Sequence, residues 1–200
     1  MLLSNAAIVK KNGLEDIYDP DVKSELLDQF LNNFTLNDTG KRQFLQEYCG
    51  MILLGDNKEH IGLNLNGTEC NGKTTFISLL DLLGSKIKHF NTNPSIRNVS
   101  VVVFDHPEKI SSSAMNRLLA TRYVIIESNT ELVLPFNMVT IPCGAVFTNN
   151  HVNRSYYLQK DCKMGEKLKD PEVVSATLNW LLEGAQRVQH CGLKNYKTYQ

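Results

Sequence analysis

Two glycines, a lysine and a threonine near residue 70 have the spacing of a phosphate-binding loop. Gly67, Gly72, Lys73 and Thr74 match the pattern GxxxxGK(S/T) at every defined position. Glycines allow positive φ and close backbone approach, so successive N–H groups can point at phosphate oxygens. We expect Lys73 to reach the β- and γ-phosphates of ATP and the Thr74 hydroxyl to coordinate Mg²⁺. The expected nucleotide-binding residues are Gly67, Thr68, Glu69, Cys70, Asn71, Gly72, Lys73, Thr74 and Thr75.

Two acids compete for the next role, which is to hold Mg²⁺ and polarise the attacking water. Asp105 follows the apolar run 101–104, and Glu127 follows the apolar run 123–126. β-branched and aromatic runs of this kind predict buried strands, so either acid would stand at a strand end. A strand-end acid can also simply face solvent. The periodicity does not choose between the two.

Amide side chains at strand ends could sense the γ-phosphate or orient the attacking water. Asn149 ends a short apolar segment that begins near residue 144, and Asn129 follows the run that carries Glu127. Asparagine at a strand end is also an ordinary turn residue. Asn149 is the first candidate and Asn129 its rival.

The elements that must position these residues alternate between apolar strands and helices, which predicts an α/β fold with a parallel sheet and flanking helices. We expect strands at 60–65, 99–104, 123–126 and 145–147. Helices are expected to begin at 19–20, 37–38, 74, 111 and 170–171, and residues 1–18 to form a frayed leader. The predicted organisation is a helical N-terminal lead at 1–55, a P-loop ATPase core at 56–155 and a C-terminal helical segment at 156–200.

Composition restricts the function less than the loop does. The chain has 21 basic and 21 acidic side chains and no net charge, so any nucleic-acid contact must come from a local patch. Five cysteines form no CxxC pair, which indicates a reducing, intracellular setting rather than a secreted protein. No apolar run is long enough for a membrane span.

Several segments, taken in order, resemble superfamily 3 helicases, particularly the primase-helicases of poxviruses, other large DNA viruses, phages and plasmids. The segment FLNNFTLNDTGKRQFLQEYCGMILLG resembles the helical lead that precedes the ATPase core in that family. The segment LNGTECNGKTTFISLLDLLG is similar to the family's phosphate loop. LLATRYVIIESN resembles the segment in which an arginine precedes a strand ending in the catalytic glutamate, and AVFTNNHVN the sensor strand. The segment MGEKLKDPEVVSATLNWLLEGAQRV is similar to the helix that closes the helicase domain in that family. The resemblance therefore spans roughly residues 25–192 of this chain.

This resemblance implies an AAA+-like ATPase that assembles into a ring, hydrolyses ATP with Mg²⁺ and moves along single-stranded DNA beside a primase domain. Carried over by position, it implies Lys73 and Thr74 at the nucleotide, Glu127 as the Walker B acid and Asn149 as the sensor. Arg154 is the nearest candidate for an arginine finger.

The chain departs from that family in one length. Only 22 positions separate Glu127 from Asn149, where the family has a longer stretch with a DNA-contacting hairpin. Two alternatives therefore stay open: a P-loop ATPase or kinase that does not act on DNA and uses Asp105, and a shortened nucleotide-binding assembly module without hydrolysis.

Overall fold

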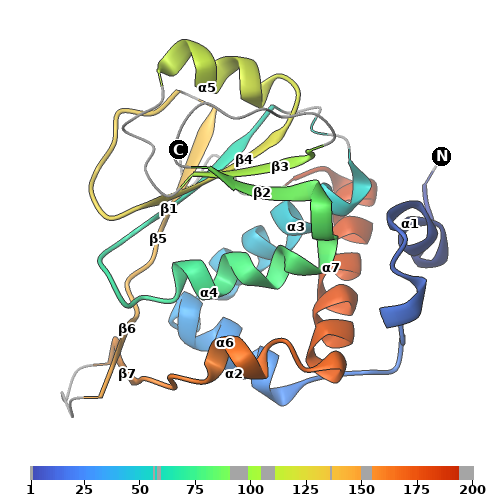
Figure 1. Cartoon of the computed structure of the whole chain (residues 1–200), viewed down its shortest axis with the longest axis horizontal. Coiled ribbons are helices and arrows are strands. Elements are labelled where there is room, and N and C mark those ends of the chain that lie inside the picture. The colour runs from blue at the N-terminus through green and yellow to red at the C-terminus, as the bar shows by residue number, and fades with distance from the viewer. Residues whose placement is uncertain are drawn as a thin grey trace.

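The structure is a computed structural model that describes residues 2–55, 57, 60–90, 99–104, 111–135, 137–149 and 155–193. Its core is a five-stranded sheet in the order β2-β3-β4-β1-β5, with every pair of neighbours parallel (Figure 1). The strands are β1 (Gly62–Asn66), β2 (Ile87–Phe90), β3 (Val101–Phe104), β4 (Tyr123–Ser128) and β5 (Met138–Pro142). The expected α/β fold with a parallel sheet and flanking helices is confirmed.

Helices cover both faces of the sheet, and the alternation of side chains along the strands explains why. The helices are α1 (Asn5–Asn12), α2 (Glu25–Thr35), α3 (Thr39–Leu54), α4 (Lys73–Ser78), α5 (Ser112–Leu119), α6 (Met164–Lys167) and α7 (Pro171–Cys191), with 3₁₀ turns η1 (Glu15–Ile17) and η2 (Leu79–Lys86). In β3, Val101 and Val103 join the large cluster with α3 and α7, whereas Val102 and Phe104 join a smaller cluster under α5. A strand buried on both faces must be apolar throughout, as β3 is.

The large cluster joins helices α3 and α7, which cross at two glycines. A Cβ atom on Gly50 would lie 2.2 Å from the backbone nitrogen of Ala185, and one on Gly184 would lie 2.0 Å from the carbonyl oxygen of Gln46. The backbones of the two helices are therefore nearly in contact. Tyr48 on α3 donates to the Val124 carbonyl at 3.1 Å, so the helical layer is also bonded directly to β4.

Two expectations for the N-terminal region were wrong. No helix begins at residues 19–20, since α2 begins at Glu25, where the Ser24 side chain accepts from the Leu27 N–H. The segment before α2 instead supplies the Asp19 carbonyl as an acceptor for Asn179 on α7. Residues 1–18 are not a frayed leader either, because α1 buries the side chains of Ile8 and Val9 in the large cluster.

The expected strand 145–147 is present as β6 (Val146–Thr148), but it lies outside the main sheet. It pairs with β7 (Tyr157–Gln159) in a separate two-stranded parallel sheet. β2, β5 and β7 were not predicted. Among the described residues, no helix is long and apolar enough to cross a membrane.

Candidate nucleotide site

The loop of residues 67–74, called here the 67–74 loop, leads from β1 into α4 and can be built only from certain residues. A Cβ atom at Gly67 would lie 2.3 Å from the carbonyl oxygen of Cys143, which is too close for any residue other than glycine. Gly72 has φ +85°, in the left-handed region that favours glycine, and Cys70 also has positive φ. The Asn71 amide donates to the Cys143 carbonyl at 3.1 Å. The loop is thus fixed against the segment that follows β5.

Lys73 is folded into the loop and surrounded by oxygens. Its ammonium donates to the carbonyls of Gly67 at 2.7 Å and Thr68 at 2.8 Å. It also donates to the side-chain oxygens of Asn71 and Asn129, each at 3.0 Å. Burial lowers the pKa of Lys73, and the charge of Glu127 acts in the opposite direction. The positive charge is held at the tip of β1 by oxygens from two sides.

Thr74 and Glu127 form the second contact across the site. The Thr74 hydroxyl donates to the Glu127 carboxylate, with its two oxygens at 2.8 Å and 3.0 Å. Glu127 lies on β4, directly beside Leu65 of β1, so the sheet register sets this contact. A hydroxyl and a carboxylate are ligands that suit Mg²⁺. Within the described ranges no three His, Cys, Asp or Glu side chains cluster around a possible metal, so phosphate oxygens and water would complete the shell.

A cavity of about 280 Å³ opens over this arrangement. Its lining combines the loop with the end of β4: Glu69, Cys70, Asn71, Gly72, Lys73, Thr74, Thr75, Glu127 and Asn129. Six of these nine belong to the 67–74 loop and Thr75 follows it, whereas Glu127 lies on β4 and Asn129 directly follows that strand. The cavity offers an ammonium, a carboxylate and amide groups to a single ligand.

A polar ladder beneath the cavity was not foreseen from the sequence. Ser128 of β4 donates to Asn64 of β1 at 2.9 Å, and Asn64 donates to Thr140 of β5 at 3.2 Å. Asn66 donates to Ser128 at 2.9 Å. Asn64 and Ser128 are buried, where a polar side chain requires partners. The ladder holds β4 in register with β1 directly below Glu127 and Asn129. The sequence signal for it was the pair Asn64 and Asn66 in β1, whose other side chains are apolar or absent.

The remaining candidate acids and sensors differ in the strand that carries or precedes them. β4, which carries Glu127, is the direct neighbour of β1, while β3 lies one strand further away. Asp105, which follows β3, and Arg154 lie outside the described residues. Asn149 follows β6 in the two-stranded sheet and does not line the cavity, whereas its rival Asn129 contacts Lys73. The structure therefore brings Lys73, Thr74, Glu127 and Asn129 together.

Fold and loop together define a parallel α/β protein with a glycine-containing loop at the carboxyl end of its first strand. No family model matches the sequence, and no curated protein matches it either. The chain is similar in structure to the C-terminal region of NrS-1 in its A form, with a TM-score of 0.59 and 12% identity over 84% of this chain and 47% of that one.

Two structures of the 305–718 region of the same protein agree. The A form gives a TM-score of 0.64 at 12% identity over 90% of this chain and 53% of that one. Another apo structure gives 0.61 at 13% identity over 90% and 54%. The likeness shows a shared fold, and this chain spans about half the length of those chains.

Proposed function

We propose that the chain is an ATP-hydrolysing domain of a DNA replication protein, acting as a superfamily 3 type helicase. The observation that carries the proposal is the meeting of Lys73 with Asn129 and of Thr74 with Glu127 at the end of β1. A cation, a hydroxyl–carboxylate pair and an amide are the groups that phosphoryl transfer from ATP requires. The fold shared with the C-terminal region of NrS-1 and the helicase-like segments of the sequence support the replication role.

In this mechanism Lys73 leaves its loop carbonyls to bind the phosphates, and the backbone amides of the loop hold them in place. Thr74 and Glu127 would hold Mg²⁺, which when bound neutralises charge on the phosphates. Glu127 would accept a proton from, or orient, the attacking water, and Asn129 would contact the γ-phosphate beside Lys73. Asn149 remains the alternative sensor.

The partners follow from the same proposal. Single-stranded DNA would be the track, and copies of this chain would form a ring in which a neighbour supplies the arginine finger, with Arg154 the candidate. Such an arginine contributes about 10³–10⁵ in rate in related chemistry. A primase domain, in the same chain or in a separate protein, would complete the assembly.

ATP turnover with and without single-stranded DNA tests the proposal. Lys73→Ala and Glu127→Gln should each lower turnover at least about 100-fold, the effect of removing one group that stabilises developing charge. Single-stranded DNA should stimulate the wild type.

Two results would contradict parts of this proposal. If Asp105→Asn abolishes turnover while Glu127→Gln and DNA have little effect, the chain is an ATPase or kinase that does not act on DNA. If the wild type binds ATP without hydrolysing it, the chain is an assembly module.

A further inference from the structure

Asn129 lies just beyond the end of the sheet, where backbone pairing between strands no longer holds the chain. The register of β1 and β4 ends at the pair Asn66 and Ser128, and Asn129 and Thr130 follow in an exposed bend. Among the described residues, the hydrogen bonds that reach Asn129 and Thr130 come from two side chains, those of Lys73 and Asn66. The position of the Asn129 amide therefore depends on these two side chains.

The Asn66 amide holds the residues on both sides of Asn129. Its nitrogen donates to the Ser128 hydroxyl at 2.9 Å and to the Thr130 carbonyl at 2.7 Å. A side-chain amide has two N–H protons, so both bonds can exist at once. The backbone N–H of Gly67, the next residue, donates to the Ser128 carbonyl at 3.0 Å. The end of β1 thus fixes the bend before and after Asn129.

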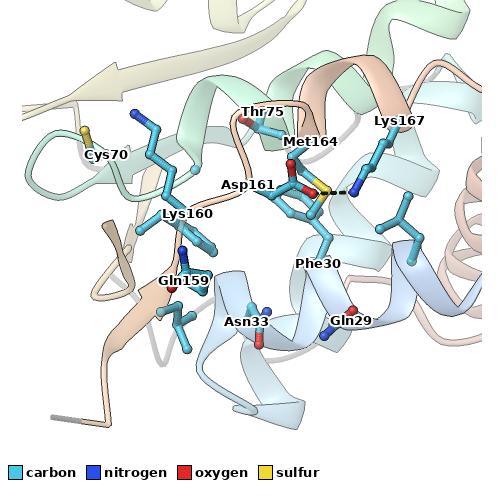
Figure 2. A pocket seen from close by; sticks show the side chains of 14 residues that line it. Gln29, Phe30, Asn33, Cys70, Thr75, Gln159, Lys160, Asp161, Met164 and Lys167 are labelled. Atoms are coloured by element: carbon cyan, nitrogen blue, oxygen red, sulfur yellow. Dashed lines mark hydrogen bonds and ion pairs between the residues drawn. The ribbon is translucent and has the colours of Figure 1, made fainter. Parts of the chain in front are cut away.

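Asn66 does not itself face the space in which a nucleotide would bind. It lines neither the cavity over Lys73 nor the larger cavity, of about 370 Å³, between the 67–74 loop and α2, whose lining side chains Figure 2 shows. Both of its amide protons already point to the bend. Asn129, in contrast, lines the cavity over Lys73 and accepts from the Lys73 ammonium at 3.0 Å. Any effect of Asn66 on the reaction passes through Asn129.

The bonds from Asn66 become more important when a phosphate reaches Lys73. In the proposed mechanism Lys73 gives up its present partners for the phosphate, and its bond to Asn129 is one of them. Asn66 is then the side chain that still holds the bend. A polar group that is already in place contributes more to the rate than one that must be ordered in each turnover.

We infer that Asn66 is a positioning residue for hydrolysis, whose amide keeps Asn129 beside the γ-phosphate after Lys73 has exchanged partners. The inference rests on the proposed function, in which Asn129 contacts that phosphate. The bonds of Lys73 to the loop do not use the Asn66 side chain. Loss of the Asn66 amide therefore lowers the rate of hydrolysis and leaves the affinity for ADP, which has no γ-phosphate, unchanged.

ATP turnover and calorimetric titration with Mg²⁺ and ADP test this inference. Asn66→Ala and Asn66→Asp should each lower kcat at least about tenfold, the effect of a displaced group in the site. Aspartate keeps the shape of asparagine but has no N–H to donate, so it separates the lost bonds from lost packing. Both variants should bind ADP as the wild type does.

A double-mutant cycle adds a readout that a purely structural role would not change. Asn129→Ala should lower kcat at least as much as Asn66→Ala does. Adding Asn66→Ala to Asn129→Ala should then lower kcat by less than about twofold, because the two residues act as a unit.

Asn57→Ala is the matched control at the opposite end of the same strand. The Asn57 amide donates at 2.9 Å to the carbonyl of Arg122, the residue directly before β4. Asn57→Ala should lower the midpoint of thermal unfolding much as Asn66→Ala does, because each variant loses amide bonds at one end of β4. It should keep the kcat of the wild type.

Several outcomes overturn the inference and leave the proposed ATPase standing. They are wild-type kcat in Asn129→Ala or in both Asn66 variants, failure of both Asn66 variants to fold, and losses that multiply in the double variant. A loss of ADP affinity that matches the loss of kcat, or an equal loss of kcat in Asn57→Ala, also overturns it. If the wild type does not hydrolyse ATP, both proposals fail.

Discussion

At the scale of single residues, Cys143 links the 67–74 loop to the sheet and carries an ionisable group. Burial raises the pKa of its thiol from 9.0 to about 12, and Lys73 opposes that shift. In the unfolded chain the thiol loses its proton near its ordinary pKa, while in the folded protein it keeps the proton until much higher pH. The thiol therefore has no effect on the free energy of unfolding below about pH 9, and lowers it as pH rises from 9 toward 12.

Replacing this thiol should flatten the alkaline part of the stability curve. Between pH 8 and pH 10, Cys143→Ala should lose about 1 kcal/mol less free energy of unfolding than the wild type. Urea unfolding at the two pH values measures this difference. Cys162→Ala is the control, because that side chain is exposed and should leave the slope unchanged. Identical slopes for wild type and Cys143→Ala would refute the prediction.

Site residues could be predicted from the sequence only where they are adjacent in the chain. The loop residues are adjacent in the chain, so their types and spacing alone predict a phosphate-binding site. The choice between Asn129 and Asn149 depends on which sheet β6 joins, and no local pattern contains that information. Asn64 was missed because its role is a hydrogen bond across three strands.

At the scale of elements, the crossing of α3 and α7 depends on Gly184. A methyl group there would meet the Gln46 carbonyl at 2.0 Å, and backbone cannot yield cheaply. Gly184→Ala should therefore lower the free energy of unfolding by at least about 2 kcal/mol, as overpacked cores do. Gly165→Ala on α6 is the matched control, since nothing lies within 4 Å of its Cβ position and its φ is not positive.

Urea unfolding of both variants measures the contrast. The control should lose nothing, or gain a few tenths of a kcal/mol, because alanine favours helix over glycine by roughly 0.5–1 kcal/mol. Equal effects in the two variants would show that α3 and α7 can move apart without cost.

Elements with strong local signals could be predicted, and those defined by pairing could not. The apolar runs of β3 and β4 and the Asp170-Pro171 start of α7 are local features, and each element lies close to its expected range. β2 exposes Lys88 and His89, and β5 ends at Pro142, so neither shows a clean strand pattern. Their identity comes from the neighbours with which they pair.

At the scale of the whole molecule, the two ends of the described chain pack together. Gln189 of α7 bonds both backbone groups of Leu3, and Gln186 donates to the Leu3 carbonyl. Residues from all three predicted segments, 1–55, 56–155 and 156–200, enter one buried cluster. α1 lies at the opposite end of the molecule from the loop between β1 and α4 (Figure 1).

This packing predicts that α1 stabilises the fold without taking part in the site. Ile8→Ala should lower the free energy of unfolding by about 2–5 kcal/mol, because the side chain is fully buried. Lys10→Ala, two residues along the same helix and exposed, should leave it nearly unchanged. Thermal unfolding measures both variants. If Ile8→Ala unfolds as the wild type does, α1 does not stabilise the fold and residues 1–18 behave as a frayed leader.

The four oxygens around Lys73 make phosphate binding an exchange of partners. A phosphate that reaches this ammonium replaces the carbonyls and amides that already accept from it, so the number of its hydrogen bonds hardly changes. The net gain in binding free energy at Lys73 then comes from the negative charge of its new partners, and not from additional hydrogen bonds. The released amide oxygens of Asn71 and Asn129 would then be free to accept a hydrogen bond from water beside the bound phosphates, whose own oxygens are also acceptors, so occupancy of the loop would expose two acceptors that now restrain Lys73.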